Sequence, residues 1–330
     1  MERVIAVVVT FNRQELLSEC ITALRRQTRK LDSILVINNG STDNTENWLR
    51  QQKDLQFVTQ KNTGSSGGFN TAINLAYQQG YSWIWCMDDD GYPKEDALEK
   101  LLEADDDNLR LLNCAVINKE DRRSFVWKTQ QYKTLDEVDV DVIHGIGHPF
   151  NGTLLNRRVI ERVGAPKTSF FLWGDETEYY YRITKVNNIP VCTIPSSIHY
   201  HPSAAFSIKK DWDHGTAWKM YYYVRNRFHV HNVKFQFKAI AWMHYLCFLA
   251  AYAGMIMVYQ KTDKLKKLSF ITWPVMHAIT NNFEATPAMI LGRLKATRSK
   301  GFTTYITSYF KSIRHAVQAA FSTQRSAANA

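Results

Sequence analysis

The chain lacks the cysteine spacing that disulfide frameworks and zinc ribbons require. Its five cysteines in 330 residues are scattered, odd in number and form no CxxC pair, which favours a reducing compartment. The opening stretch MERVIAVVVTFN has an apolar core too short for a cleavable signal peptide. We therefore expect a cytoplasmic protein.

Two common nucleotide-binding motifs are missing as well. The glycine-rich stretch Gly64–Gly68 lacks the Gly-Lys-Ser/Thr ending of a Walker loop. No GxGxxG follows the first predicted strand, so a dinucleotide site is disfavoured. Glycines at 64–68 would still let the backbone approach a nucleotide or a sugar closely.

Acidic residues are scarce in the last part of the chain. Residues 1–205 carry 23 Lys and Arg against 27 Asp and Glu, a balance of −4, whereas residues 206–330 carry 18 against 4, a balance of +14. The net charge of +10 therefore comes from the second range. Such a range is suited to an anionic surface, either phospholipid or nucleic acid.

Apolar periodicity predicts an α/β protein with a mostly parallel sheet and helices on both faces. Strands are expected at 4–10, 33–38, 55–60 and 82–87, alternating with helices at 13–27, 44–52, 68–80 and 94–104. Beyond about residue 105 the pattern predicts a strand at 150–156, helices at 157–164 and 175–186, extended structure at 189–201, and a helical region from about 206.

Polar segments follow all four early strands. They are Thr10–Arg13, Asn38–Asp43, Asn62–Asn70 and Asp88–Asp90. Ligands of open parallel sheets bind beyond the carboxyl ends of the strands, so we expect a binding site along this edge.

Three successive aspartates end the fourth strand without a basic neighbour in the sequence. Mutual repulsion makes this arrangement costly unless a cation is present. Mg²⁺ and Mn²⁺ prefer carboxylate oxygens, so we expect Asp88 and Asp90 to bind one of them while Asp89 turns towards the substrate. The alternative is a solvated loop that caps the next helix.

Two further constellations accompany the triplet. Asp175 and Glu176 begin a predicted helix, where a carboxylate could act as a general base; Glu178 and Arg182 have the spacing of a structural i,i+4 ion pair. His199 and His201 alternate on one side of an extended segment, and one of them could complete a metal site.

These segments together resemble the inverting family-2 glycosyltransferases with a GT-A fold, over about residues 3–205. The resemblance is carried, in order, by VVVTFNR, VINNGSTD, NTGSSGGFN, CMDDDG, FNGTLLN, FFLWGDETEYYYR and IHYHP. Within that family, the NxGxxGGF pattern and the later Trp218–Arg227 segment are similar to bacterial rhamnosyl- and galactofuranosyltransferases of polysaccharide and O-antigen synthesis.

The resemblance implies a role for each matching residue. It assigns nucleotide binding to Thr10, Asn12, Arg13, Asn39 and Asp43, the rest of the donor to Asn62, Gly67, Gly68, Asn70 and Asp89, the metal to Asp88, Asp90 and either His201 or His199, and the acceptor to Trp173, Asn151 and Gly152. The family's base is usually the second acid of an ED or DD pair, which favours Glu176 here and leaves Asp175 as the alternative. The implied partners are a nucleotide-sugar donor such as UDP-galactofuranose or dTDP-rhamnose, a glycan or lipid-linked glycan acceptor, and Mn²⁺ or Mg²⁺.

Two other functions are weighed against this one. A nucleic-acid-binding protein would use the basic second range, but that range shows no recognised nucleic-acid fold. A sugar-nucleotide pyrophosphorylase would need a glycine-rich loop with Arg and Lys after the first strand, and TFNRQE does not supply it.

The second range contains a long uncharged segment. Residues 239–259 carry no Asp, Glu, Lys or Arg and are flanked by lysines on both sides, so they could span a membrane, lie in its surface or form a buried helix. We expect 1–205 to be the catalytic domain and 206–330 a basic, aromatic-rich helical region. That region would attach the protein in plane to the inner face of the cell membrane or help to bind the acceptor. No feature of the sequence indicates an oligomeric state.

Overall fold

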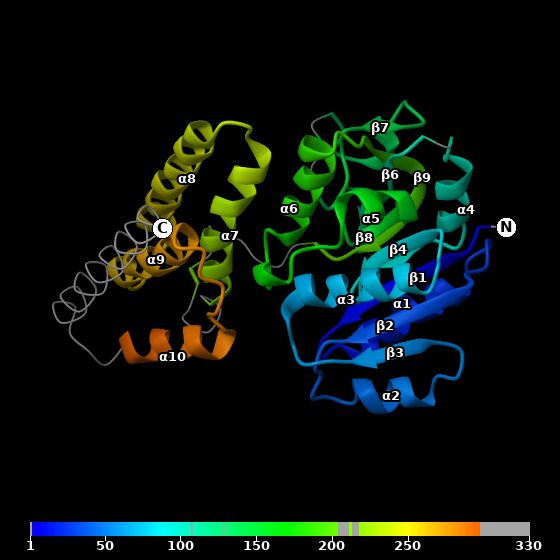
Figure 1. The fold of residues 1–330 in the computed structure, drawn as a ribbon, viewed down its shortest axis with the longest axis horizontal. Coiled ribbons are helices and arrows are strands. Elements are labelled where there is room, and N and C mark those ends of the chain that lie inside the picture. Colours follow the sequence, from blue (N-terminus) through cyan, green and yellow to red (C-terminus); the bar gives the residue numbers. More distant parts are fainter. Residues whose placement is uncertain are drawn as a thin grey trace, which may run out of the picture. The chain divides into compact units, whose positions relative to one another are not determined.

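The computed structural model describes residues 2–297, apart from residues 107, 128, 130, 204–210 and 213–217. The chain divides into two compact units, Met1–Ala205 and Phe206–Ala330. Figure 1 traces both units along the chain, and each is described by itself below.

The first unit begins with the expected alternation of strands and helices. Its elements are β1 (Val4–Thr10), α1 (Gln14–Arg25), β2 (Ser33–Asn38), α2 (Thr45–Gln51), β3 (Gln56–Thr59), α3 (Gly64–Gln78) and β4 (Trp83–Asp88). The four strands pair in parallel in the order β3-β2-β1-β4. This confirms the predicted parallel sheet.

The rest of this unit extends the sheet with mixed pairing. The elements are β5 (Tyr92–Pro93), α4 (Ala97–Glu103), β6 (Leu111–Asn118), β7 (Ile143–His144), β8 (Asn151–Asn156), α5 (Arg157–Val163), α6 (Asp175–Tyr181) and β9 (Val191–His201). Strand β8 lies antiparallel between β4 and β6, and β9 runs parallel to β6. A short π-helix, Arg182–Val186, continues α6.

Alternation along β1 explains why helices cover both faces of the sheet. Val4, Ala6 and Val8 pack into one apolar cluster with residues of α1, α2 and α4, whereas Ile5 and Val7 pack into another with residues of α3, α5 and α6. Successive side chains of a strand point to opposite faces, so a fully buried β-branched strand fits only between two helical layers.

Two of the longer elements differ from the sequence prediction. Strand β6 was not predicted, although its segment LLNCAVIN is apolar and buried. Helix α3 begins at Gly64 rather than at 68, so the glycine-rich stretch forms the first turn of a helix.

The second unit is helical as far as it is described. It contains α7 (Trp218–Lys234), α8 (Lys238–Tyr259), α9 (Lys264–Ile279) and α10 (Pro287–Thr297). Within the described residues, α8 alone is long and apolar enough to cross a membrane, with a mean hydropathy of 1.5 over its best 18-residue window and 22% of that window buried. The predicted function of this range in acceptor or membrane association stays a prediction.

Candidate active site

Strand register brings the predicted site residues to one edge of the sheet. Thr10 at the end of β1 pairs with Asn38 at the end of β2, and the β4 residue Met87, next to Asp88, pairs with Asn151 at the start of β8. His201 ends β9. The carboxyl ends of the parallel strands therefore meet the first residue of the antiparallel one.

Asp89 is held by the first strand and the loop after it. Thr10 Oγ1 donates to Asp89 Oδ2 at 2.7 Å, and Arg13 Nη1 lies 3.1 Å from Asp89 Oδ1 and 2.8 Å from Asp90 Oδ2. Asp89 is 3% exposed. Both oxygens of Asp89 therefore bind the protein itself in this structure, and the expectation that Asp89 turns towards the substrate stays a prediction.

Arg13 provides the positive charge beside the triplet, although no basic residue is close to the triplet in the sequence. Its guanidinium bridges Asp89 and Asp90, although 76 residues separate Arg13 from Asp89 along the chain. The role in nucleotide binding that the resemblance implies for Thr10 and Arg13 stays a prediction; in this structure both side chains organise the triplet.

Asp88 is the unsatisfied member of the triplet. Its carboxylate has no hydrogen bond or ion pair to any residue that the structure describes. Burial raises the pKa of Asp88 well above its usual range, and the charges of Asp90, Glu176, Asp89 and Asp175 raise it further. Four neighbouring carboxylates therefore act on a group without a positive partner.

Asp90 faces His201. Nε2 of His201 lies 3.2 Å from Asp90 Oδ1. Burial alone would raise the pKa of Asp90, but the hydrogen bond and charge of His201 and the charge of Arg13 outweigh it and lower the pKa to about 2. Nδ1 of His201 contacts the Pro202 carbonyl at 2.7 Å; with a proton on Nδ1, loss of the Nε2 proton would free Nε2 to bind a cation in place of its contact with Asp90.

His199 does not reach this edge. It is fully buried, and neither ring nitrogen has a hydrogen-bond partner among the residues that the structure describes. A Cβ at Gly91 would lie 2.3 Å from His199 Nε2, so the loop after the triplet covers the ring. Burial lowers the pKa of His199 to about 3. Of the two histidines, His201 alone lies beside Asp90.

These residues fit an open divalent-cation site. Among the described residues, no group of three or more His, Cys, Asp or Glu is placed to hold a metal ion by itself, so a cation here would need further ligands from a substrate or water. Mg²⁺ and Mn²⁺ are usually held by one or two carboxylates, with substrate phosphates and water completing the shell. The unpartnered Asp88 carboxylate beside Asp90 and His201 is a donor set of this kind.

The second pair of acids begins α6 and faces the same edge. Ser65 Oγ donates to Asp175 Oδ2 at 2.7 Å, and Asn151 Nδ2 donates to Glu176 Oε1 at 3.0 Å. Burial raises the pKa of Asp175 to about 6 against the hydrogen bond from Ser65, which lowers it. Burial and the charge of Asp175 raise the pKa of Glu176 to about 8. The charges of Glu176 and Asp175 both raise the pKa of Asp88, and Glu176 is bound to Asn151, whose strand partner Met87 precedes Asp88.

Asn151 and Gly152 are buried behind this pair. Asn151 positions Glu176, and a Cβ at Gly152 would lie 2.9 Å from Cys114 Sγ and 3.0 Å from His199 Cβ. Neither residue is exposed in the structure, and the acceptor role that the resemblance implies for both residues stays a prediction. Trp173, the third predicted acceptor residue, is half-buried with a φ of 55° directly before Gly174. Such backbone costs about 1–3 kcal/mol in a non-glycine residue.

Four asparagine and aspartate residues that the resemblance assigns to the nucleotide or the rest of the donor, Asn12, Asn39, Asp43 and Asn62, mostly shape their own loops. Asn39 is buried and donates to the Gly64 carbonyl at 2.8 Å, while Asn62 Oδ1 accepts from the Gly64 N–H at 2.9 Å. Asn12 Oδ1 accepts from the Thr42 N–H at 2.6 Å. Asn12 and Asp43 are exposed at this edge, so of these four residues they are the accessible ones.

Gly67, Gly68 and Asn70, which the resemblance assigns to the donor, contact the protein itself in this structure, and their donor role stays a prediction. A Cβ at Gly67 would lie 2.1 Å from Thr63 Oγ1, and one at Gly68 would lie 2.4 Å from Val9 Cγ1. Asn70 Nδ2 donates to the Pro166 carbonyl at 2.8 Å. The close approach that these glycines permit is therefore between α3 and the protein itself.

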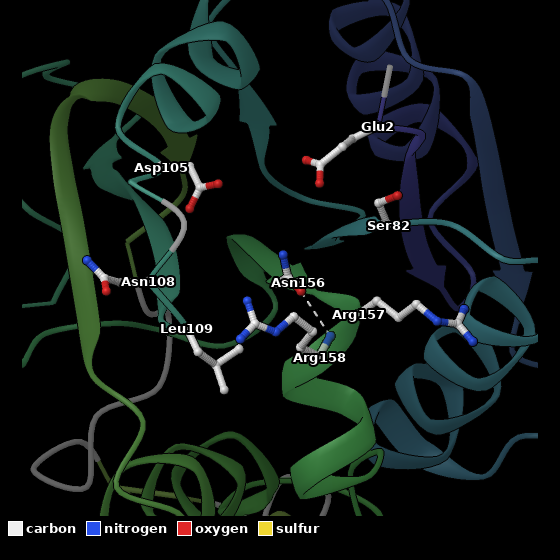
Figure 2. A pocket seen from close by; sticks show the side chains of 8 residues that line it. All are labelled: Glu2, Ser82, Asp105, Asn108, Leu109, Asn156, Arg157 and Arg158. Carbon is white, nitrogen blue, oxygen red and sulfur yellow. Dashed lines mark hydrogen bonds between the residues drawn. The ribbon is translucent and has the colours of Figure 1, made fainter.

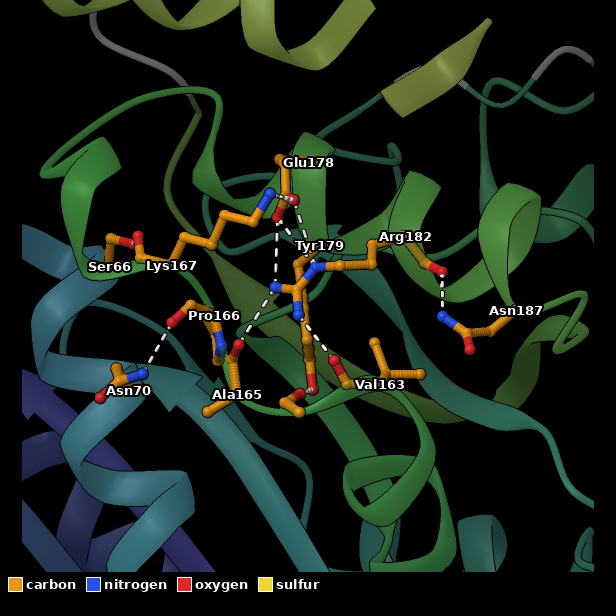
Figure 3. A network of polar contacts seen from close by, with 11 residues as sticks. Ser66, Asn70, Val163, Ala165, Pro166, Lys167, Glu178, Tyr179, Arg182 and Asn187 are labelled. Carbon is orange, nitrogen blue, oxygen red and sulfur yellow. Dashed lines mark hydrogen bonds and ion pairs between the residues drawn. The ribbon is translucent and has the colours of Figure 1, made fainter. Parts of the chain in front are cut away.

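A buried ion-pair network fixes the loop that leads to α6 (Figure 3). The expected Glu178–Arg182 pair is confirmed at 3.2 Å, and Lys167 Nζ lies 2.8 Å from the same carboxylate oxygen. Arg182 also donates to the carbonyls of Val163 and Ala165. The network holds residues 163–167 against the helix that carries Asp175 and Glu176.

Comparison with known proteins places the sequence of this chain in a family. The family model for glycosyl transferase family 2 matches residues 5–164. The galactofuranosyltransferase GlfT1 of Mycolicibacterium smegmatis is 31% identical over 223 residues, which cover 63% of this chain and 74% of the relative. The chain belongs to glycosyl transferase family 2. GlfT1 of Mycobacterium tuberculosis is 29% identical over 222 residues, covering 63% of this chain and 73% of the relative.

A solved structure supports the fold of this glycosyltransferase. Staphylococcus aureus TarS, residues 1–349 in complex with UDP, matches with a TM-score of 0.55 at 13% identity, covering 89% of this chain and 87% of that one. The chain therefore has the GT-A fold with a C-terminal helical region. A glycosyltransferase of this family binds a nucleotide-sugar donor and a glycan acceptor.

A pocket of about 220 Å³ lies at the opposite edge of the glycosyltransferase's sheet (Figure 2). Its lining includes Glu2 before β1, Ser82 before β4 and Asn156 at the end of β8. It contains none of the predicted site residues.

Trp127, which the sequence analysis did not identify, lies beside His201 at the acidic edge, the edge of the sheet that carries Asp88–Asp90. The ring of Trp127 lies 5.2 Å from that of His201 and 4.6 Å from that of His148, measured between centroids. No sequence motif singles it out, because the long connection after β6 brings it to the site.

Proposed function

We propose that this glycosyltransferase moves a sugar, with inversion, from a nucleoside-diphosphate donor to a hydroxyl of a lipid-linked or growing polysaccharide. UDP-galactofuranose is the first donor to test, because the relatives at about 30% identity are galactofuranosyltransferases. The UDP complex of TarS is compatible with a uridine nucleotide, and dTDP-rhamnose is the second donor.

The observation that carries the proposal is the position of Glu176, which Asn151 ties to the strand beside the triplet. Its carboxylate, held by Asn151 at 3.0 Å, contributes to the raised pKa of Asp88. Two groups of acids thus lie at one edge of the sheet, one suited to hold a cation that would bind a diphosphate and one suited to receive a proton. Inverting transfer needs such an arrangement, because the acceptor hydroxyl attacks from the face opposite the leaving group.

Glu176 has the properties of a general base. A base works best with a pKa near the working pH, and burial together with Asp175 raises the pKa of Glu176 to about 8. Asn151 fixes one carboxylate oxygen, which leaves the other to accept the proton from the acceptor hydroxyl. A single displacement then inverts the anomeric carbon, and no second acid is required on the leaving-group side.

Asp88 and Asp90, with His201, would hold Mg²⁺ or Mn²⁺. When bound, the cation supplies positive charge to the departing nucleoside diphosphate. Arg13 and Thr10 hold Asp89 away from this set and keep Asp88 and Asp90 at the end of the strand.

One screen tests the function. The purified protein is incubated with Mn²⁺ or Mg²⁺, octyl galactofuranoside or octyl rhamnoside, and a panel of nucleotide sugars, and both nucleotide release and glycoside product are measured. We expect product from UDP-galactofuranose or dTDP-rhamnose, with the anomeric configuration of the donor inverted. Retention of configuration, or product formation unaffected by a chelator, would contradict the proposed mechanism.

We further propose that α8 attaches the protein to the inner membrane surface in plane. Ala241, Tyr245, Tyr252 and Ile256 form its buried face, while the opposite face is apolar and exposed. That face includes Ile240, Met243, Leu246, Met257 and Val258. A helix that is apolar all round but covered on one side leaves a face suited to lipid. Lys261, Lys264 and Lys266 follow it, each worth about 1 kcal/mol near anionic lipid.

A further inference from the structure

The segment that follows β6 delivers Trp127 to the acidic edge. The Asn118 N–H donates to the Ser124 carbonyl at 2.8 Å, and the Val126 N–H donates to the Val116 carbonyl at 3.0 Å. Residues 124–126 therefore run antiparallel along the end of β6. Trp127 comes directly after them, at the edge where β6 and β9 end.

Trp127 rests on two histidines. Its ring is tilted by 43° to His201 and by 32° to His148. His201 in turn lies 3.2 Å from Asp90, so one side chain separates the indole from the triplet. Burial lowers the pKa of His148 to about 4, which keeps that ring neutral and makes it an uncharged support.

Trp127 is not a core residue. Trp83 and Trp85 are buried within an apolar cluster of the sheet, whereas Trp127 is half-buried and belongs to neither of the clusters that flank β1. Its indole N–H has no hydrogen-bond partner among the residues that the structure describes. An amphipathic ring of this kind offers an apolar face and a polar donor.

The strand order tells on which side of the reaction centre Trp127 lies. Across the sheet, the loops of β2 and β1 come first, then Asp88 on β4, then Asn151 on β8, and finally β6 and β9. Asn151 holds Glu176. Along the edge of the sheet, the loops assigned to the nucleotide therefore come first, the candidate base Glu176 next, and Trp127 after it.

We propose that Trp127 forms the wall on which the acceptor sugar packs, with the indole N–H donating to one of its hydroxyl groups. This assignment rests on the proposed function. A sugar ring presents an apolar C–H face and a polar edge, and sites for such ligands combine an aromatic surface with a few polar groups. Trp127 and the nearby carboxylates provide that combination on the acceptor side.

Steady-state kinetics with octyl galactofuranoside and octyl rhamnoside test the assignment. Trp127→Ala is expected to raise the acceptor KM about tenfold, while the donor KM and the acceptor-independent release of nucleotide stay within about twofold. Trp127→Phe keeps the apolar face and should recover most of the loss. Tyr132→Ala, in the same connection and bonded to Asp139, is the matched control and should leave all three quantities unchanged.

The outcomes separate the assignment from the function on which it rests. An unchanged acceptor KM in Trp127→Ala would overturn the assignment. So would a loss of acceptor-independent nucleotide release equal to the loss of transfer, because Trp127 would then only support His201. Absence of transfer by the unaltered protein to either glycoside would overturn the proposed function and the assignment with it.

Discussion

Asn151 and Glu176 are joined by a 3.0 Å hydrogen bond between the first residue of β8 and the second residue of α6. Asn151 pairs with Met87, the residue before Asp88. One buried amide therefore links the candidate base to the strand that carries the triplet. This hydrogen bond ties α6 to the strand beside the one that carries Asp88.

Glu176→Gln should abolish most of the transfer activity. A glutamine keeps the shape and the contact with Asn151 but accepts no proton, and general bases contribute roughly 10²–10⁴-fold. We expect kcat to fall by at least about 100-fold with little change in donor KM. Asp175→Asn should cost less, because Asp175 is bound to Ser65. Full activity of Glu176→Gln with an inactive Asp175→Asn would move the base to Asp175.

The acid limb of the pH–rate profile should move to lower pH in Asp175→Asn. Glu176 must be deprotonated to work, so activity falls as the pH drops below its pKa. Burial and then the charge of Asp175 raise that pKa to about 8. Removing the charge lowers the pKa of Glu176 and extends activity downwards. Glu46→Gln removes an equal charge from an exposed ion pair on α2 and should leave the limb in place; an identical profile for Asp175→Asn would contradict the coupling.

Asp88→Asn should stabilise the metal-free protein and remove its response to Mn²⁺. Burial and four neighbouring carboxylates raise the pKa of Asp88 in the folded state. Once the pH exceeds the ordinary pKa of an aspartate in the unfolded chain, the Asp88 carboxyl group therefore lowers the stability of the fold. The asparagine lacks this penalty and also lacks the ligand.

Thermal unfolding at pH 7.5 with EDTA, and with Mn²⁺ plus UDP, measures both effects. The wild-type Tm should rise with the ligands as mass action requires, and the Tm of the variant should not. Equal increases in the two proteins would show that Asp88 holds no cation.

The sequence-based prediction was most accurate for strands that are buried on both faces, because their residue pattern fits only one kind of structure. The observed bounds of β1 and β2 match the predicted ones, because continuous β-branched runs fit only a strand between two helical layers. The carboxyl-end rule then placed the polar loops correctly at one edge. Strand β6 was missed because its apolar run follows an irregular acidic segment.

Contacts distant in the sequence explain the other differences. Arg13 reaches Asp89 and Asp90 only because β1 lies beside β4. His199 and His201 look equivalent in the sequence, and only the path of the loop at Gly91 shows that one is covered. A glycine needs space beside it, but the sequence does not tell whether a ligand or the protein's own backbone occupies that space.

Gly64→Ala tests the contact between α3 and the loop before the acidic pair. Gly64 has a φ of 74°, and a Cβ there would lie 1.9 Å from the Phe171 carbonyl oxygen. We expect a loss of about 3 kcal/mol or more in the free energy of unfolding. Gly80→Ala is the matched control, since its φ is 79° and no atom lies within 4 Å of the added carbon; it should cost about 1 kcal/mol. Urea unfolding measures both, and equal losses would show that backbone strain alone matters.

The exposed face of α8 should determine binding to membranes. Leu246→Glu places a charge on that face, where the leucine is 58% exposed. Burying a leucine in lipid is worth about 1.5–3 kcal/mol, so the variant should bind vesicles containing phosphatidylglycerol about tenfold more weakly or worse. Val186→Glu is the control, since Val186 is 59% exposed but lies in the first unit, and it should bind like the unaltered protein.

Sedimentation with these vesicles at low and high salt separates the two attractions on α8. Salt weakens the electrostatic attraction between the lysines after the helix and the anionic lipid, whereas the apolar contact of Leu246 with the lipid remains. We therefore expect the unaltered protein to bind at low salt and to be partly released at high salt, with Leu246→Glu weaker under both conditions. An unaltered protein that stays in the supernatant at low salt would rule out attachment through this helix, and equal binding by Leu246→Glu would place the contact elsewhere.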